Sequence, residues 1–205
     1  ATKNRFGNTA ELGIYEMCQR GLREVTNPSE MLISRREGEQ LSGCAVGVTL
    51  EGIRPLLIEA QALVSTAAYG TPQRSVTGFD SKRMNMLLAV LEKRANQKTY
   101  NQDVYINVAG GLELSEPAAD LALCLAVVSS LRDEAIAADV AVMGEVGLAG
   151  EVRAIPQCER RIAECQRLGF TTIVLPRENL RRIKQPEGVK LIGVDTVMQA
   201  ISVMF

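Results

Sequence analysis

One stretch, residues 110–130, constrains the fold more than any other part of this sequence. Gly110 and Gly111 interrupt a strand-like segment, and Pro117 opens a run of small and aliphatic residues that extends to Ser130. Proline fits the first turn of a helix, because its missing N–H would have no partner there. A helix that is apolar on all sides has to be buried. We therefore expect a buried helix from Pro117 onward, with its N-terminus at a glycine-rich turn.

The start of this helix is a favourable place for a nucleophile or an anion. Free N–H groups and the helix dipole favour negative charge there. The first helical residues, Pro117, Ala118 and Ala119, carry no reactive group. The sequence thus predicts the geometry of a reactive site without the side chains that could react.

Composition limits the possible functions. The 205 residues, 46% of them hydrophobic, suffice for one large domain, or for one domain with an appendage. A net charge of −1 argues against a strongly basic nucleic-acid binder, although local basic patches remain possible. The absence of histidine removes the commonest general base and metal ligand. The five cysteines show no CxxC spacing, so we predict a reduced, cytoplasmic protein with no metal site.

Two further features concern the extent of the chain. No stretch is long and apolar enough for a membrane span, and no signal peptide is visible, so we expect no membrane association. The sequence begins on Ala1 without an initiator methionine, which suggests a fragment of a longer protein.

The spacing of apolar residues predicts strands that alternate with helices in the second half of the chain and hairpins in the first half. We expect strands at residues 43–50, 56–64, 103–108, 141–146, 151–155, 171–175 and 189–194. We expect helices after Asp80, from Pro117, and over residues 157–168, 177–183 and 196–204, the last one capped by Asp195. Residues 65–79 are predicted to form a loop, and the first 30 residues a β-hairpin that belongs to a neighbouring domain.

A serine–lysine dyad could perform acyl transfer without histidine. The natural position for the serine, at the start of the buried helix, holds Ala118, and the start of the helix near residue 157 supplies no lysine. Ser115 is interpreted as a capping or turn residue, and Cys158 has no base beside it. A residual peptidase that uses one of these two residues is the enzyme alternative. The phosphate-loop pattern is absent, and the glycines between residues 144 and 150 are interpreted as turn residues.

Basic side chains on the predicted helices are the remaining signal. They form either a solvated face that balances the acidic residues or a weak, sequence-independent contact to phosphates. The candidates for DNA contact are Lys82, Arg83, Lys93, Arg94, Arg160, Arg161, Arg181 and Arg182.

Two sequence blocks resemble the protease domain of Lon-type proteases. Residues 114–122, LSEPAADLA, resemble the block in which the nucleophilic serine follows a proline. Residues 144–152, GEVGLAGEV, resemble the block that precedes the catalytic lysine. In this register the serine of the family falls on Ala118 and its lysine on Glu159. The resemblance therefore implies a Lon-like fold that has lost both halves of the dyad.

The N-terminal sequence Lys3-Asn4-Arg5-Phe6-Gly7 resembles the KNRFG signature of the RadA/Sms DNA-repair family. That resemblance implies an α/β (α+β) fold of the Lon-protease-like, ribosomal-protein-S5-domain-2-like type, with an N-terminal β-hairpin left over from a RecA-like ATPase core. Residues 1–30 would end the ATPase core, and residues 31–205 would form a catalytically inactive Lon-protease-like domain.

The same resemblance implies a function in ATP-dependent branch migration during recombinational DNA repair. The expected partners are further copies of the chain in a hexameric ring, together with single-stranded or branched DNA and the RecA recombinase. ATP, magnesium and zinc are expected only in parts outside these residues. Lys3 and Arg5 would act on a nucleotide in a neighbouring subunit or have a structural role only. The further alternative is a protein-interaction module that docks RecA or replication proteins.

Overall fold

The computed structural model describes residues 15–18, 21–24, 29, 33, 41–68 and 70–205. The predicted KNRFG motif, residues 3–7, lies outside these described residues. In the N-terminal part, where the sequence predicted a hairpin, strands β1 (Tyr15–Cys18) and β2 (Gly21–Glu24) pair in antiparallel fashion.

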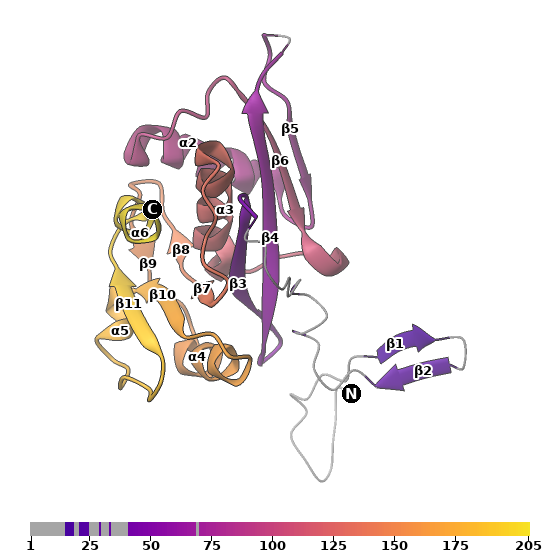
Figure 1. Cartoon of the computed structure of the whole chain (residues 1–205), viewed down its shortest axis with the longest axis vertical. Helices are drawn as coiled ribbons and strands as arrows, with labels where there is room; N and C mark the ends of the chain where they lie inside the picture. The colour runs from indigo at the N-terminus through magenta and orange to yellow at the C-terminus, as the bar shows by residue number, and fades with distance from the viewer. Residues whose placement is uncertain (1–14, 19–20, 25–28, 30–32, 34–40, 69) are drawn as a thin grey trace.

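A seven-stranded mixed sheet organises the remainder of the chain, in the order β11-β10-β7-β3-β4-β6-β5 (Figure 1). The central β3–β4 and β4–β6 pairs are antiparallel, and the other neighbours are parallel. Its strands are β3 (Cys44–Glu51), β4 (Arg54–Thr66), β5 (Arg74–Thr77), β6 (Gln102–Val108), β7 (Val140–Val142), β10 (Thr172–Pro176) and β11 (Lys190–Val194). A separate two-stranded sheet joins β8 (Glu145–Val146) to β9 (Val152–Arg153). The predicted mixed α/β class is confirmed.

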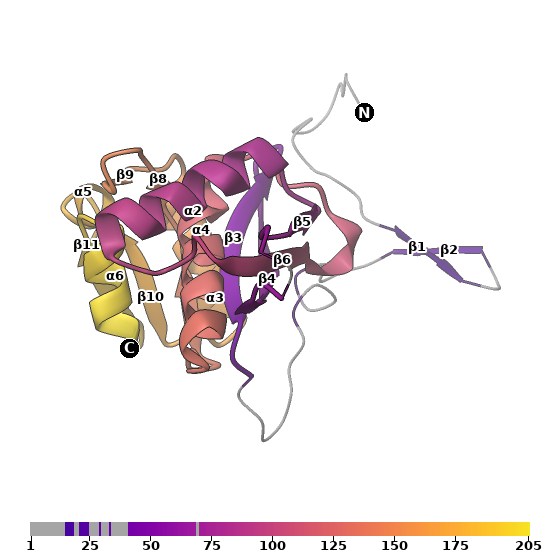
Figure 2. The same ribbon diagram turned by 90° about the horizontal axis from the view of Figure 1, so that it is seen from above.

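Helices cover both faces of this sheet. The helices are α2 (Ser81–Ala95), α3 (Asp120–Arg132), α4 (Cys158–Arg167), α5 (Arg177–Leu180) and α6 (Val197–Met204), with short 3-10 turns η1 (Ala109–Gly111) and η2 (Pro117–Ala119). Helices α2, α3 and α6 lie side by side and pack into one apolar cluster (Figure 2). Helix α4 packs into a second cluster. The adjacent β4 residues Leu57 and Ile58 belong to different clusters, because successive side chains of a strand point to opposite faces.

The predicted buried helix is confirmed. It begins as η2 at Pro117 and continues as α3, of which only the last three residues are not fully buried. Asp80 caps α2 as predicted, because its carboxylate accepts a hydrogen bond from the Arg83 N–H at 2.7 Å. Gly169 follows α4 with a φ of +83°, which suits the predicted helix-ending glycine.

Three predictions about elements are wrong in detail. Thr196, and not Asp195, caps α6; the Asp195 carboxylate instead pairs with Arg177 at 2.6 Å. The predicted loop at residues 65–79 contains the strand β5, which gains its stability by pairing with β6. The predicted strand at 141–146 is interrupted at Gly144, where an added Cβ would lie 2.7 Å from a methyl carbon of Val152.

The described part of the chain also includes one residue of the N-terminal segment that packs on the sheet. Ser29 is fully buried, accepts a hydrogen bond from the Leu57 N–H at 3.2 Å and donates one to Glu164 of α4 at 3.1 Å. None of the helices among the described residues combines the length and the apolar character that a bilayer crossing demands.

Candidate functional site

The fold brings the two Lon-like sequence blocks into direct contact. The Gly144 N–H donates to the Ala118 carbonyl at 2.8 Å, and the Leu121 N–H donates to the Gly144 carbonyl at 3.1 Å. Ala118 is 1% exposed and belongs to the same apolar cluster as Cys158 and Met143. A methyl group in an apolar cluster has no means of attacking a carbonyl, so position 118 now contributes only to packing.

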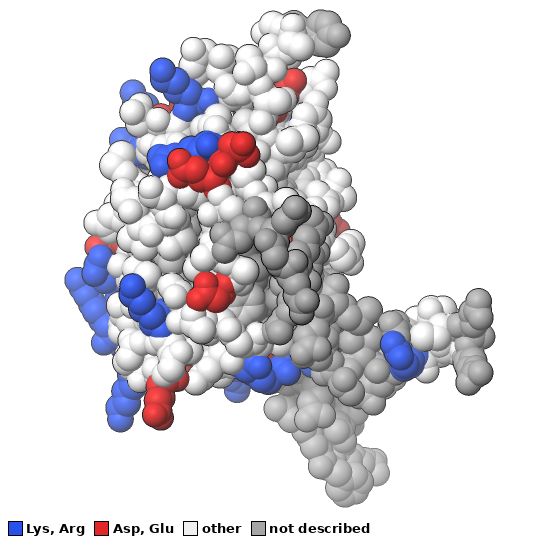
Figure 3. All heavy atoms as spheres, in the orientation of Figure 1, with Lys and Arg blue, Asp and Glu red and all other residues white. Residues whose placement is uncertain are grey.

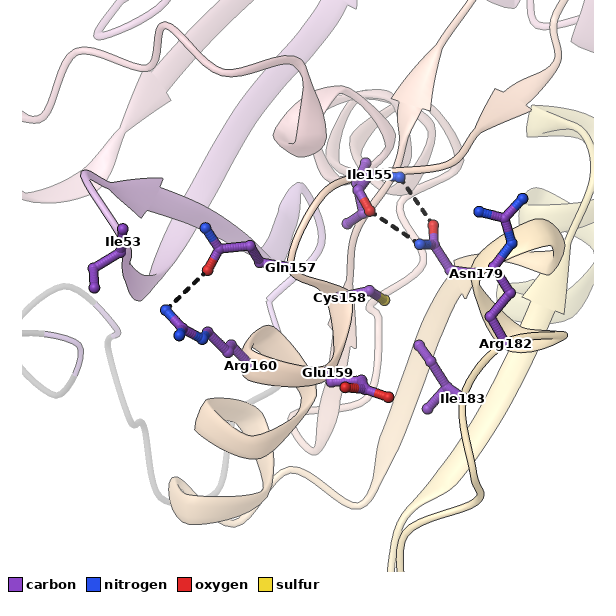
Figure 4. Close-up of a pocket in the computed structure, with 9 residues that line it drawn as sticks. All are labelled: Ile53, Ile155, Gln157, Cys158, Glu159, Arg160, Asn179, Arg182 and Ile183. Carbon is purple, nitrogen blue, oxygen red and sulfur yellow. Dashed lines mark hydrogen bonds between the residues drawn. The ribbon is translucent and has the colours of Figure 1, made fainter.

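Position 159 lies in a different environment. Glu159 is exposed in the first turn of α4, where it lines an open cleft of about 600 Å³ (Figure 4). Gln157 begins the helix with a φ of +53°. A carboxylate is intrinsically a much weaker base than the neutral amine of a lysine, and Ala118 offers it no hydroxyl proton to accept. We name this hollow the α4 cleft; its lining residues are Ile53, Ile155, Gln157, Cys158, Glu159, Arg160, Asn179, Arg182 and Ile183.

A buried ion pair joins the two blocks beside these positions. Arg161 is 0% exposed, and its guanidinium binds the Glu116 carboxylate. The same guanidinium donates to the Val48 carbonyl at 2.8 Å and to the Pro156 carbonyl at 3.0 Å. Glu116 in turn accepts from the Leu50 N–H at 2.8 Å. The prediction that Arg161 contacts DNA is therefore wrong, because a fully buried guanidinium with these partners does not face solvent.

A second ion pair fixes the first turn of α3. The fully buried Asp120 carboxylate accepts from Arg83 through both of its oxygens, with the Nε–Oδ1 distance at 2.7 Å, and also from the Val146 N–H at 3.1 Å. Burial raises the pKa of Asp120, and the hydrogen bond from Arg83 opposes that effect. The hydrogen bond to Asp120 raises the pKa of Arg83. Arg83 is thus engaged in a structural pair, which makes it a poor candidate for the DNA contact that the sequence predicted.

Sequence reasoning missed the structural roles of Glu116 and Asp120, although a signal was present. Asp120 is the one polar residue within an otherwise apolar stretch, residues 117–128. A carboxylate is almost never fully buried without a partner, so its presence there indicated a buried cation. The partners themselves come from distant segments, and no local pattern identified them.

The other predicted DNA-contacting cations are exposed, and they occupy two regions. Lys82, Lys93 and Arg94 lie on α2, and none of the ion pairs among the described residues involves them. Arg160, Arg181 and Arg182 lie on or beside α4 and α5. On the face that Figure 3 shows, basic side chains form separate groups with acidic side chains between them. The prediction of contacts from both regions remains a prediction.

The residues considered for a residual peptidase have no catalytic geometry here. Burial raises the pKa of the Cys158 thiol to about 11, and its sulfur lies 3.9 Å from that of Met143. A protonated thiol is a poor nucleophile. Ser115 is exposed, and no side-chain hydrogen bond caps η2, so its predicted capping role is not present. Within the described ranges, no group of three histidine, cysteine or acidic residues is placed to hold a metal ion.

Comparison with known proteins places these observations in a family. Residues 82–203 match the family described as Lon protease (S16) C-terminal proteolytic domain. The chain is also similar to proteins named DNA repair protein RadA. It is 45% identical to that of Bacillus subtilis over 201 residues (98% of this chain and 44% of the relative). It is 46% identical to that of Synechocystis over 203 residues (99% and 40%). The chain thus spans less than half the length of these relatives.

Proposed function

Because the chain belongs to the family of Lon protease C-terminal domains and to the RadA family of DNA-repair proteins, we propose that it is a non-proteolytic, ring-forming scaffold that contacts DNA. The observation that carries the first part is the replacement of both dyad positions, by Ala118 in an apolar cluster and by Glu159 in an open cleft. The buried pair of Arg161 and Glu116 supports it, because it joins the two Lon-like blocks through structural contacts beside the proposed dyad positions. We place the fold in the ribosomal-protein-S5-domain-2-like type.

The proposal for the whole protein extends beyond these residues. A RecA-like ATPase, whose core would end in the hairpin at residues 1–30, would bind ATP, magnesium and zinc in other parts of the chain. It would drive branch migration with a RecA recombinase in the cytoplasm. Residues 31–205 would hold the copies together, most simply as a hexameric ring. Ser29 lies on the N-terminal side of this boundary, yet its side chain packs between β4 and α4 of the Lon-like part.

Assembly is tested with the isolated chain. Size-exclusion chromatography with light scattering should give a defined oligomer whose mass is a multiple of the 22.3 kDa chain. A strict monomer at high concentration would contradict the scaffold function. The same sample should show no turnover of casein and no labelling by a fluorophosphonate probe, and stoichiometric labelling that is lost in Ser115→Ala would revive the peptidase alternative.

The α2 cations are the best candidates for DNA contact, because three of them share one helix and none is part of an ion pair with a described residue. Contacts to phosphates release counterions, so affinity should fall with salt. We expect a triple Lys82, Lys93 and Arg94→Gln variant to bind a labelled single-stranded oligonucleotide more weakly and with a smaller salt dependence. Lys190→Gln, on β11, is the control. Equal binding by both variants would remove α2 from the proposed contact.

The roles of Lys3 and Arg5 have to be tested in the full-length protein. If either cation reaches a nucleotide in a neighbouring subunit, alanine at that position should lower DNA-stimulated ATP hydrolysis and leave assembly intact. Loss of assembly in these variants would instead assign the motif a structural role.

A further inference from the structure

The α4 cleft has an apolar lining that none of the proposed activities uses. Three isoleucines line it, and they come from three separate segments: Ile53 from the β3–β4 turn, Ile155 from the segment before α4, and Ile183 from the segment after α5. Figure 4 shows these segments around the first turn of α4. The cleft is therefore formed only in the folded chain, and its lining combines these apolar side chains with polar and charged ones.

Charged groups accompany this apolar surface. Arg160 projects from α4 and donates to the Gln157 side chain at 3.1 Å, which places its guanidinium on the Ile53 side of the cleft (Figure 4). Arg182 lies on the α5 side, where it pairs with Glu178 at 2.7 Å and remains 74% exposed. An exposed i,i+4 pair contributes little energy, so Arg182 can exchange that partner for another carboxylate. With Glu159 as the one acid in the lining, the lining residues carry a net charge of +1 from two arginines and one glutamate.

Hydrogen bonds hold the cleft open in a fixed shape. The Ile155 N–H donates to the Asn179 side chain at 2.9 Å, and the Asn179 amide donates back to the Ile155 carbonyl at 2.9 Å. This reciprocal pair joins α5 to the segment before α4. A preformed site loses less conformational entropy on binding than one that must order itself.

The chemistry of the lining distinguishes between classes of ligand. Single-stranded nucleic acids bind through basic grooves that also present aromatic side chains for stacking. The α4 cleft has no aromatic lining residue on which bases could stack. A peptide that alternates apolar and acidic residues satisfies both features, with apolar side chains on the isoleucines and carboxylates at Arg160 and Arg182.

We propose that the α4 cleft is a docking site for an extended, acidic–apolar segment of a protein partner, which it binds without cleavage. The volume of about 600 Å³ accommodates a segment of a few residues. This site is separate from α2, on which the proposed DNA contact rests, so either proposal can fail without the other.

The test uses the isolated chain with isoleucine δ1-methyl labels. The probe is the acetylated, amidated peptide Asp-Leu-Asp-Leu-Asp, and its Lys-Leu-Lys-Leu-Lys counterpart is the charge control. We expect the acidic probe to shift the methyl signals of Ile53, Ile155 and Ile183, and to leave those of Ile106 and Ile201 in the other apolar cluster unchanged. Arg160→Glu should weaken binding about tenfold or more, whereas Lys82→Glu, on α2, should leave the peptide affinity within about twofold.

Three results would overturn the proposal. They are the absence of methyl shifts at the cleft isoleucines up to millimolar peptide, equal shifts with the lysine peptide, and shifts of the same methyls by oligothymidylate that competes with the acidic peptide. The last result would assign the cleft to nucleic acid. Methyl spectra of each variant without peptide establish that it is folded.

Discussion

At the scale of single residues, the most informative side chain is the buried Arg161. Its neighbour Arg160 is exposed, although both arginines belong to the same helix turn and the sequence predicted a DNA contact for each. The difference arises because Glu116, Val48 and Pro156 supply acceptors for one guanidinium and not for the other. A charge pattern in a sequence thus does not reveal which cation faces solvent.

Arg161→Ala should destabilise the fold strongly. The substitution leaves Glu116 without its cation in a partly buried position, and removal of one partner of a buried pair costs about 3–5 kcal/mol. Arg160→Ala is the matched control and should change the free energy of unfolding by roughly 0.5 kcal/mol or less. Urea denaturation measures both. A cost for Arg161→Ala that equals that of the control would show that the buried pair contributes nothing.

Because of its buried thiols, we expect the protein to lose stability at alkaline pH. Burial raises the pKa of Cys158 from an ordinary 9.0 to about 11, and it also raises those of Cys124 and Cys165. A thiol with a raised pKa holds its proton more tightly in the folded state. Its contribution to stability is therefore fully present below pH 9 and is lost as the pH rises toward 11.

The expected slope is at most about 1.4 kcal/mol per pH unit for each such thiol. Cys158→Ser should make the decline of the unfolding free energy between pH 9 and 11 less steep, because serine does not titrate in this range. Denaturant melts at several pH values measure the slope. An unchanged slope in this variant would show that Cys158 keeps an ordinary pKa in the folded protein.

At the scale of elements, the starts of α3 and α4 carry the two positions proposed for the missing dyad, and hydrogen bonds join the two Lon-like blocks. Ala118 lies within the apolar cluster, whereas Glu159 lines the α4 cleft. We expect the double substitution Ala118→Ser and Glu159→Lys not to restore peptidase activity, because the buried serine would not meet a substrate. Labelling by a fluorophosphonate probe and casein turnover test this. Stoichiometric labelling of the double variant, and not of either single variant, would contradict it.

Elements with a strong local pattern were predictable from the sequence, and those that depend on distant partners were not. The apolar run that forms α3 and the capping residue Asp80 are local features, and both predictions are confirmed. The strand β5 has only four residues between glycines and proline, and its pairing with β6 is what makes it a strand. Thr196, and not Asp195, caps α6, whereas the Asp195 carboxylate pairs with Arg177 from a separate segment.

The candidate site was predictable to a similar extent. The sequence predicted that the two Lon-like blocks belong together, and the structure brings them into contact; the assignment of Ala118 and Glu159 as the dyad positions stays a prediction. The sequence did not reveal the α4 cleft, because residues from three separate segments form its apolar walls. Nor did it identify the two buried ion pairs, whose partners are separated by 37 and 45 positions.

At the scale of the whole molecule, one sheet connects two apolar clusters. Neighbouring residues of the same strand, such as Leu57 and Ile58, contribute to different clusters. Loss of packing on one face therefore removes support from the strands that hold the other, and we expect the described Lon-like part to unfold as one cooperative unit.

Two cysteines report on the two clusters separately. Cys124 lies in the cluster of α3 and Cys165 in that of α4. Thiol labelling along a urea gradient, with mass spectrometry of the labelled peptides, should show both cysteines becoming reactive at the same denaturant concentration. Reactivity of Cys165 well before that of Cys124 would show that the α4 side is an independent folding unit.

The ion pair between Glu116 and Arg161 has a consequence for how such sequences diverge. Glu116 and Arg161 each lie two residues from a proposed dyad position. The ion-pair positions and the dyad positions are nevertheless constrained differently. Ala118 and Glu159 have no contact that binds their identities together, so each can vary alone. Glu116 and Arg161 cannot, because either change alone leaves an unbalanced charge in the interior. Across an alignment of homologous sequences, these two columns should therefore change together, and a relative with a neutral residue at one should carry a neutral residue at the other.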